Sequence, residues 1–65
     1  MLDTEKIRQL RLKAGLSYEE AATRAGFNNR QQWYAIESGQ RTNIELATLE
    51  KIASALGVKA KDLLT

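Results

Sequence analysis

The chain has 65 residues, with ten Lys or Arg against eight Asp or Glu, which gives a formal net charge of +2. It contains no cysteine and no histidine, so it has no thiol nucleophile, no disulfide and none of the commonest zinc ligands. A phosphate-binding glycine loop is also absent from the sequence. We therefore expect no enzymatic activity, no metal and no cofactor, and a single domain over residues 1–65.

The composition indicates a folded globular chain, because 43% of the residues are hydrophobic and 28% are charged. No apolar run approaches the roughly 20 residues of a membrane span. The N-terminus lacks the basic start and apolar stretch of a signal peptide. We expect a cytoplasmic protein without membrane contact, whose mildly positive charge is compatible with a polyanionic partner.

The first predicted helix begins at Asp3 or Thr4, since either side chain can accept a bond from the free amides of a first turn. Arg11 lies beside its apolar face, and Gly15 ends it. The residues of that face recur three or four positions apart: Ile7, Leu10 and Ala14. This spacing predicts a short amphipathic helix.

Two further helices follow around a glycine turn. Ser17 and Glu20 match a capping box, and the helix that they open ends at Gly26. Asn29 with Gln32 is a second cap signal, which predicts a helix over about 30–38. The apolar seam of the first of these helices consists of small residues: Ala21, Ala22 and Ala25. The inner face of the second is marked by Trp33 and Ile36, with Glu37 beside them.

Residues 42–45, Thr-Asn-Ile-Glu, match another capping box and predict the start of a fourth helix. Gly57 stops it, and the apolar residues after Gly57 indicate one or two last helical turns. The fourth helix carries the strongest amphipathic stripe in the chain: Leu46, Leu49, Ile52, Ala53 and Leu56. No segment alternates with period two, so the predicted fold class is all-α.

A helix, a short glycine turn and a second helix form the arrangement of a helix-turn-helix. Five motifs stand around it in order: Ile7-Arg8-Gln9-Leu10-Arg11, Gly15-Leu16-Ser17, Ala22-x-x-x-Gly26, Ile36-Glu37-Ser38-Gly39 and Leu49-x-x-Ile52-Ala53-x-Ala55-Leu56-Gly57-Val58. Over roughly residues 4–64 the chain resembles the XRE family, the phage Cro and repressor type of DNA-binding domain. The resemblance implies a compact five-helix, lambda-repressor-like domain that binds operator DNA as a two-fold dimer.

The sequence departs from the family pattern at the helix-turn-helix. Ile36 and Glu37 come one residue later than usual, so the turn is expected to be one residue longer. Tyr18 stands where the family commonly has a phosphate-binding glutamine. Ala21 and Trp33 stand where leucine and isoleucine are usual, and this exchange could conserve core volume. That hypothesis requires Trp33 to be buried.

Base contacts are expected from the start of the recognition helix, because such a helix reads base edges mainly with its N-terminal residues. Arginine can bind guanine, and glutamine can bind adenine, through two hydrogen bonds each. The candidates are Arg30, Gln31, Tyr34 and Gln32. The alternative is a solvated polar face, and for Gln32 it is closure of the cap at Asn29.

Phosphate contacts are expected from Tyr18, Asn28, Asn29, Gln40, Arg41 and Asn43. Tyr18 follows a helix cap whose free amides attract anions, but its ring could instead pack against the recognition helix. The two asparagines of the turn could instead serve a left-handed turn. Arg41, in the loop after the recognition helix, is the strongest single candidate.

The family pattern implies an ion pair between Arg11 and Glu37 that fixes how the recognition helix docks. The alternative is two exposed charges of little consequence. The resemblance also implies dimerisation through the C-terminal region, where Leu63, Leu64 and residues 59–61 could make the contact.

The expected function is sequence-specific binding of double-stranded DNA by a transcriptional regulator of the repressor type. The competing reading is a protein-interaction module, such as a coactivator or an antitoxin, built on the same fold. An exposed Trp33 within an apolar patch would favour that alternative.

Overall fold

The computed structural model describes residues 2–41 and 43–64. These residues form four α-helices and one 3-10 helix: α1 (Thr4–Lys13), α2 (Tyr18–Ala25), α3 (Arg30–Glu37), α4 (Leu46–Leu56) and η1 (Ala60–Leu63). The all-α prediction is confirmed. Extended pairing in the described part of the chain is limited to one antiparallel bridge between Leu2 and Leu64.

The expected fifth helix is wrong, because the last segment forms only a four-residue 3-10 turn. The Asp62 carboxylate accepts a hydrogen bond from the Lys59 backbone amide at 3.2 Å, and the Leu64 amide donates to the Lys61 carbonyl. These short-range bonds leave room for a single turn. A 3-10 helix rarely extends beyond three or four residues, which fits the length of η1.

Three predicted helix starts are confirmed by their capping bonds. The Asp3 carboxylate accepts from the Lys6 amide at 3.1 Å. Ser17 and Glu20 form the reciprocal capping box, with distances of 3.1 and 3.0 Å. The Asn29 side chain accepts from the backbone amide three residues later. Such caps involve only neighbouring residues, which is why the sequence predicts them.

The predicted start of α4 is wrong. The helix begins at Leu46, and its N-cap Glu45 makes no side-chain capping bond. Thr42, which the capping-box prediction required, lies outside the described residues. The first turn of α4 follows an extended residue at Glu45, where φ is −72° and ψ is 155°.

Glycines end α2 and α4 in the left-handed conformation, with φ of +80° at Gly26 and +74° at Gly57. A residue with a side chain is strained at such angles even where space is free. Gly26 therefore fixes the direction in which the chain leaves α2 and approaches α3.

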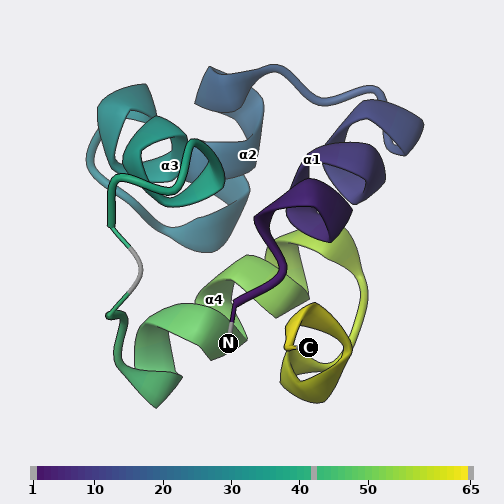
Figure 1. The fold of residues 1–65 in the computed structure, drawn as a ribbon. Coiled ribbons are helices and arrows are strands. Elements are labelled where there is room, and N and C mark those ends of the chain that lie inside the picture. Colours follow the sequence, from purple (N-terminus) through teal and green to yellow (C-terminus); the bar gives the residue numbers. More distant parts are fainter. Residues whose placement is uncertain (1, 42, 65) are drawn as a thin grey trace.

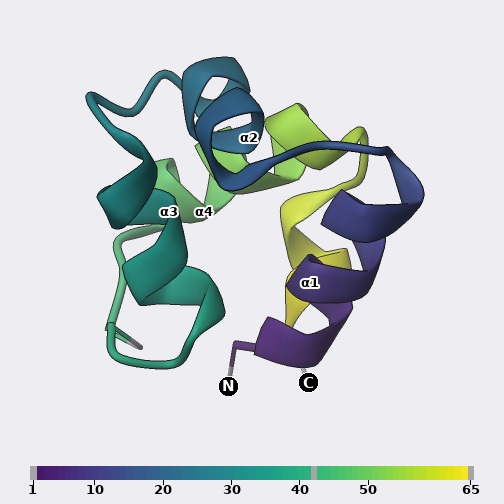
Figure 2. The ribbon, with the colours of Figure 1, turned by 90° about the horizontal axis from the view of Figure 1, so that it is seen from above.

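Figures 1 and 2 show α2 and α3 side by side, with α1 on the other side of the molecule and α4 running beneath them. α4 contacts α1, α2 and η1, while α3 contacts α1 and α2. The two ends of the described chain meet, since the Asp3 amide donates to the Leu63 carbonyl at 2.7 Å. This arrangement leaves one side of α3 on the surface.

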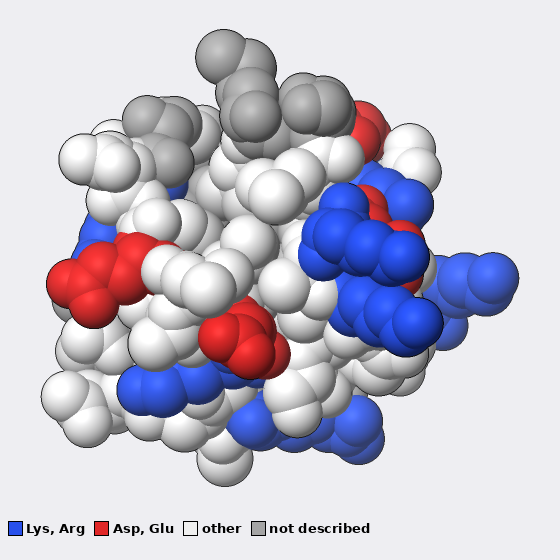
Figure 3. Space-filling view, turned by 90° about the horizontal axis from the view of Figure 1, so that it is seen from below, with Lys and Arg blue, Asp and Glu red and all other residues white. Residues whose placement is uncertain are grey.

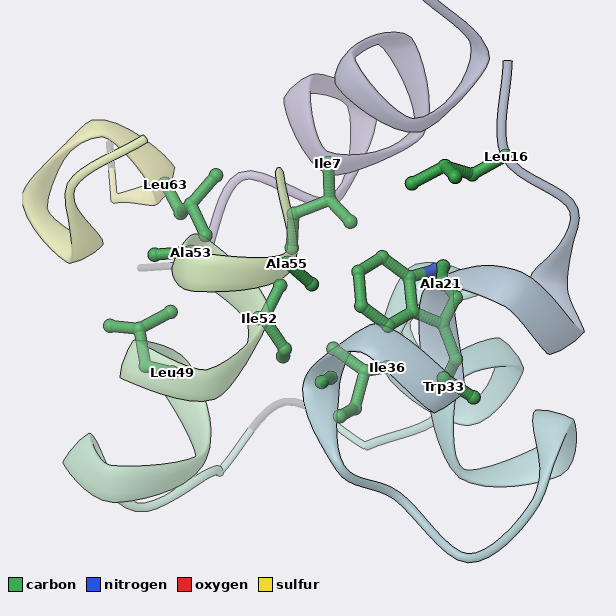
Figure 4. Close-up of a cluster of buried hydrophobic side chains, with 12 residues drawn as sticks. Ile7, Leu16, Ala21, Trp33, Ile36, Leu49, Ile52, Ala53, Ala55 and Leu63 are labelled. Atoms are coloured by element: carbon green, nitrogen blue, oxygen red, sulfur yellow. The ribbon is translucent and has the colours of Figure 1, made fainter. Parts of the chain in front are cut away.

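The core lies between the four helices and η1 (Figure 4). Its buried hydrophobic residues are Ile7, Leu16, Ala21, Ala22, Ala25, Trp33, Ile36, Leu49, Ile52, Ala53, Ala55 and Leu63. Trp33 is the largest of them and is 1% exposed, and Ala21 is fully buried. The hypothesis that the small Ala21 and the large Trp33 together conserve core volume required a buried Trp33, and this condition is met.

Two leucines were assigned to the wrong environment. Leu46 was placed in the apolar stripe of the fourth helix, but it is 67% exposed, because it is the first residue of α4 and precedes the packed turns. Leu63 was offered as a dimer contact, but it is fully buried in the core. Leu64, the other leucine of that segment, is 49% exposed.

Candidate nucleic-acid interface

The inner side of α3 is fixed by a buried ion pair with α1. The Arg11 Nε donates to Glu37 Oε1 at 2.8 Å, and Arg11 Nη2 donates to Glu37 Oε2 at 3.1 Å. The two residues are 7% and 8% exposed. Two parallel bonds of this kind set orientation as well as distance. The pair therefore defines how α3 sits against α1.

Each partner of the pair has a further bond. Arg11 Nη1 donates to the Leu16 carbonyl at 2.8 Å, and the Trp33 indole Nε1 donates to Glu37 Oε1 at 3.0 Å. The hydrogen bond with Glu37 raises the pKa of Arg11 above its ordinary value, although burial acts in the opposite direction. The indole bond was missed from the sequence, where the four-residue spacing of Trp33 and Glu37 was the available signal.

Tyr18 packs its ring between α1 and α3. The Arg11 Cζ lies 4.3 Å from the centre of the Tyr18 ring, a cation–π contact. The Tyr18 and Tyr34 rings meet nearly at right angles, with their centres 5.3 Å apart. The Tyr18 ring thus packs against α3, which is one of the two roles considered for this residue.

The outer side of α3 is exposed. Arg30 and Gln31 lie in the first turn of the helix and are both exposed, and Tyr34, one turn later, is 46% exposed. These three candidates for base contact therefore share one accessible surface. Trp33 and Glu37 of the same helix are buried instead, at 1% and 8% exposed.

The fourth candidate for base contact, Gln32, is occupied by the turn. The Gln32 side-chain oxygen accepts a hydrogen bond from the backbone amide of Asn28 at 2.9 Å. The backbone amide of Gln32 donates to the side-chain oxygen of Asn29 at 3.1 Å. The left-handed role considered for Asn28 and Asn29 is wrong, since no described residue other than glycine has a positive φ. Gly26 supplies the left-handed residue, and Asn29 is the extended N-cap of α3.

The loop after α3 borders a hollow of about 320 Å³ beside the α2–α3 turn. Its lining includes two cations, Arg41 and Lys51, together with the polar side chains of Gln32 and Thr48. The Arg41 amide donates to the Ala35 carbonyl at 2.9 Å, which fixes the loop against the end of α3. Lys51 was not among the candidates, because a single lysine on a helix gives no sequence signal.

The remaining candidates for phosphate contact, Gln40 and Asn43, are exposed in the segment between α3 and α4. Together with Arg41 they place polar side chains beyond the C-terminal end of α3. The candidates thus divide into a group at the start of α2 and α3 and a group after α3.

Two kinds of site are not found in the part of the chain that the structure describes. Residues 2–41 and 43–64 hold no group of three or more acidic side chains suited to a metal ion. None of the helices formed by these residues is long and apolar enough to cross a membrane.

The comparisons with known proteins agree with this geometry. A family model described as a helix-turn-helix domain matches residues 4–64. The control protein C.BamHI of Bacillus amyloliquefaciens is 43% identical over 65 residues, which covers 98% of this chain and 78% of that protein.

Two solved structures of the regulator SinR are similar to this chain. SinR in complex with DNA, described as the master regulator for biofilm formation, superposes with a TM-score of 0.87 at 31% identity. The superposition covers 98% of this chain and 100% of that one. A complex of SinR with SinI gives a TM-score of 0.86 at 32% identity, over 97% of this chain and 60% of the matched chain. The chain therefore belongs to the XRE family of helix-turn-helix domains.

Proposed function

We propose that this protein is a transcriptional regulator that binds double-stranded DNA sequence-specifically, with α3 in the major groove. The observation that carries the proposal is the division of α3 into two sides. On one side, Trp33 and Ile36 are buried in the core and Glu37 is held in the ion pair. On the other, Arg30 and Gln31 of the first turn are exposed. A recognition helix presents its N-terminal residues to base edges in this way.

Arg30 and Gln31 are the proposed base-reading residues, with Tyr34 beside them. Arginine offers two donors to guanine O6 and N7, and glutamine offers a donor and an acceptor to adenine. Gln32 is the weakest of the four candidates, since its side chain already accepts the Asn28 amide. We assign it to the turn, where it supports the start of α3.

The proposed phosphate contacts flank this surface. Arg41, Gln40 and Asn43 serve one strand from the segment after α3, and Lys51 joins Arg41 at the hollow that they share. Asn28 is the candidate near the α2–α3 turn, while Asn29 is held by its capping bond and the Tyr18 ring is packed against Arg11 and Tyr34. Such contacts hold the domain in register but do not read sequence.

A dimer is proposed because one copy is too small to reach two half-sites. The Cα atoms extend 24 × 21 × 19 Å, whereas successive major grooves on one face of DNA lie about 34–36 Å apart. Figure 3 shows the molecule from below the view of Figure 1, with uncharged atoms over much of this face, acidic side chains at its left and near its centre, and basic side chains at its right and along its lower edge. Leu46 and Leu64, both exposed, supply apolar surface for a two-fold contact.

The relatives support the same assignment. SinR has been solved with DNA, and C.BamHI is a control protein. The resemblance to phage repressors favours repression of a promoter that overlaps a palindromic operator. An exposed Trp33 would have favoured the alternative of a protein-interaction module, but Trp33 is 1% exposed.

The test is selection of the purified protein on a random duplex library, followed by a salt titration on the enriched sequence. We expect an enriched palindrome whose affinity falls steeply between about 50 and 200 mM salt. An enriched single half-site would keep DNA reading but remove the proposed dimer. Failure to enrich any sequence at low salt would overturn the proposed function.

A further inference from the structure

A continuous series of contacts runs from the core to the exposed side of α3. The Trp33 indole and Arg11 both bind Glu37, Arg11 lies under the Tyr18 ring, and that ring meets Tyr34. Each side chain in this series contacts one whose position is already fixed by the preceding contact. The buried groups therefore restrict the exposed ones. Tyr34 is the last residue of the series and, at 46% exposed, the only one of the five on the outer side of α3.

The position of Tyr18 is settled before any ligand is present. Arg11 is held by three hydrogen bonds, two to Glu37 and one to the Leu16 carbonyl, so the surface under the Tyr18 ring does not shift. Tyr18 is itself half-buried in the first turn of α2. Its ring therefore acts as a wall beside α3.

This wall restricts Tyr34. The two rings are 81° apart with centres separated by 5.3 Å, which is the favoured edge-to-face arrangement of aromatic pairs. A tyrosine held in this way keeps one orientation, whereas a free tyrosine on a helix surface would sample several rotamers. A side chain oriented in advance loses less entropy when it binds.

We propose that Tyr18 is a positioning residue for base reading: it orients Tyr34 so that Tyr34 determines specificity at one part of the half-site. The inference rests on the proposed function, and it assigns Tyr18 a role through its ring rather than through its hydroxyl. A tyrosine oriented toward a groove can offer its ring to a thymine methyl group and its hydroxyl to a base edge.

Four variants separate the ring from the hydroxyl: Tyr18→Phe, Tyr18→Ala, Tyr34→Ala and the double alanine variant. Each is titrated against the selected duplex and every single-base substitution of it. Leu12→Ala, on an exposed residue of α1, is the matched control. Proton NMR of the free proteins reports the ring-current shift of Tyr34 caused by the ring of Tyr18.

We expect Tyr18→Phe to keep both the base-preference profile and the Tyr34 shift. Tyr18→Ala should abolish the shift and lose about two- to tenfold of discrimination, at the same base pairs that Tyr34→Ala affects and at no others. The double alanine variant should lose no more discrimination than Tyr34→Ala alone. A residue that only stabilises the fold would not lose discrimination at particular base pairs as alanine and keep it as phenylalanine.

Two results would overturn the inference while leaving the proposed function intact. One is equal weakening by Tyr18→Phe and Tyr18→Ala across all duplexes, which would assign the hydroxyl to a phosphate. The other is an unchanged base-preference profile in Tyr18→Ala. If the wild-type protein selects no sequence, the proposed function fails, and this inference fails with it.

Discussion

The two sides of α3 differ in how their side chains are satisfied. On the inner side, Trp33, Ile36 and Glu37 are each at most 8% exposed, and the one charged group among them has partners on both α1 and α3. On the outer side, Arg30 and Gln31 are exposed. One helix of eight residues thus carries both fixed contacts and exposed polar groups.

This difference teaches that stability and recognition can be altered separately in this domain. Changes to the inner side remove packing or orphan a buried charge, and both lower the free energy of unfolding. Changes to the outer side leave the core untouched and act on the bound complex. The predictions below test that separation, beginning with the largest expected effect.

Replacing Trp33 with alanine should lower the free energy of unfolding by about 3–5 kcal/mol, because it empties the largest core position. It also removes the indole donor of Glu37. Urea unfolding measures the change, with Leu12→Ala as the exposed control, expected within about 0.5 kcal/mol of wild type. A loss below about 1 kcal/mol for Trp33→Ala would show that α3 does not depend on this side chain.

Breaking the buried ion pair from one side should cost about 3–5 kcal/mol, since an unpaired charge remains buried. Arg11→Met leaves the Glu37 carboxylate with the indole alone, while Glu37→Gln keeps an acceptor for that indole. The double variant should be more stable than Arg11→Met. A double-mutant cycle by urea unfolding in a fixed sucrose concentration gives the coupling, and simple additivity would refute the proposed pair energetics.

On the outer side, Arg30→Ala should weaken binding to the selected duplex by about 1–3 kcal/mol and relax the preference at one base pair. Its free energy of unfolding should stay within about 0.5 kcal/mol of wild type. Arg8→Ala is the matched control, because Arg8 is exposed on α1 and, among the described residues, forms an ion pair with the nearby Glu5. Fluorescence anisotropy on the duplex and its single-base variants measures both effects. Equal weakening on every duplex would make Arg30 a phosphate contact.

Arg41→Ala should weaken binding evenly across sequences and reduce the slope of log affinity against log salt by about one. The reason is that a phosphate contact releases a counterion and carries no sequence information. Anisotropy titrations at four salt concentrations give the slope, with Arg8→Ala again as the control. An unchanged slope would remove Arg41 from the interface.

The smallest expected effect concerns the α2 cap. The backbone amide of Ser17 donates to the Glu20 carboxylate and, with the Ser17 hydroxyl, lowers the pKa of Glu20 below its usual 4.5. Because the folded-state pKa is the lower one, the stabilisation is complete above about pH 4.5 and is lost as the pH falls through the folded-state pKa. Urea midpoints between pH 6 and 3 should fall less steeply for Glu20→Gln than for wild type. Parallel curves would contradict the cap assignment.

The sequence predicted what depends on neighbouring residues. The caps at Asp3, Ser17 and Asn29 and the bounds of α3 follow from short motifs, because capping bonds span three residues. The start of α4 was misjudged, since the motif at residues 42–45 predicts a helix that begins after residue 42, whereas α4 begins at Leu46. The number of helices was taken from the family resemblance, and a single 3-10 turn stands in place of the fifth.

The candidate interface was less accessible from the sequence. The pairing of Arg11 with Glu37 came from the family pattern, as the two residues are 26 positions apart. The contact of Tyr18 with Tyr34 depends on how α2 packs on α3, which no local pattern encodes. The place of Lys51 beside Arg41 depends in the same way on the position of α4.

The most direct measurement is a selection on the random duplex library with a variant that carries Arg30→Ala, Gln31→Ala and Tyr34→Ala together. Urea unfolding of the same sample shows whether the fold is retained. The separation of the two sides predicts a free energy of unfolding within about 1 kcal/mol of wild type and no enriched sequence. A variant that still enriches the wild-type sequence would contradict the claim that the outer side of α3 reads DNA.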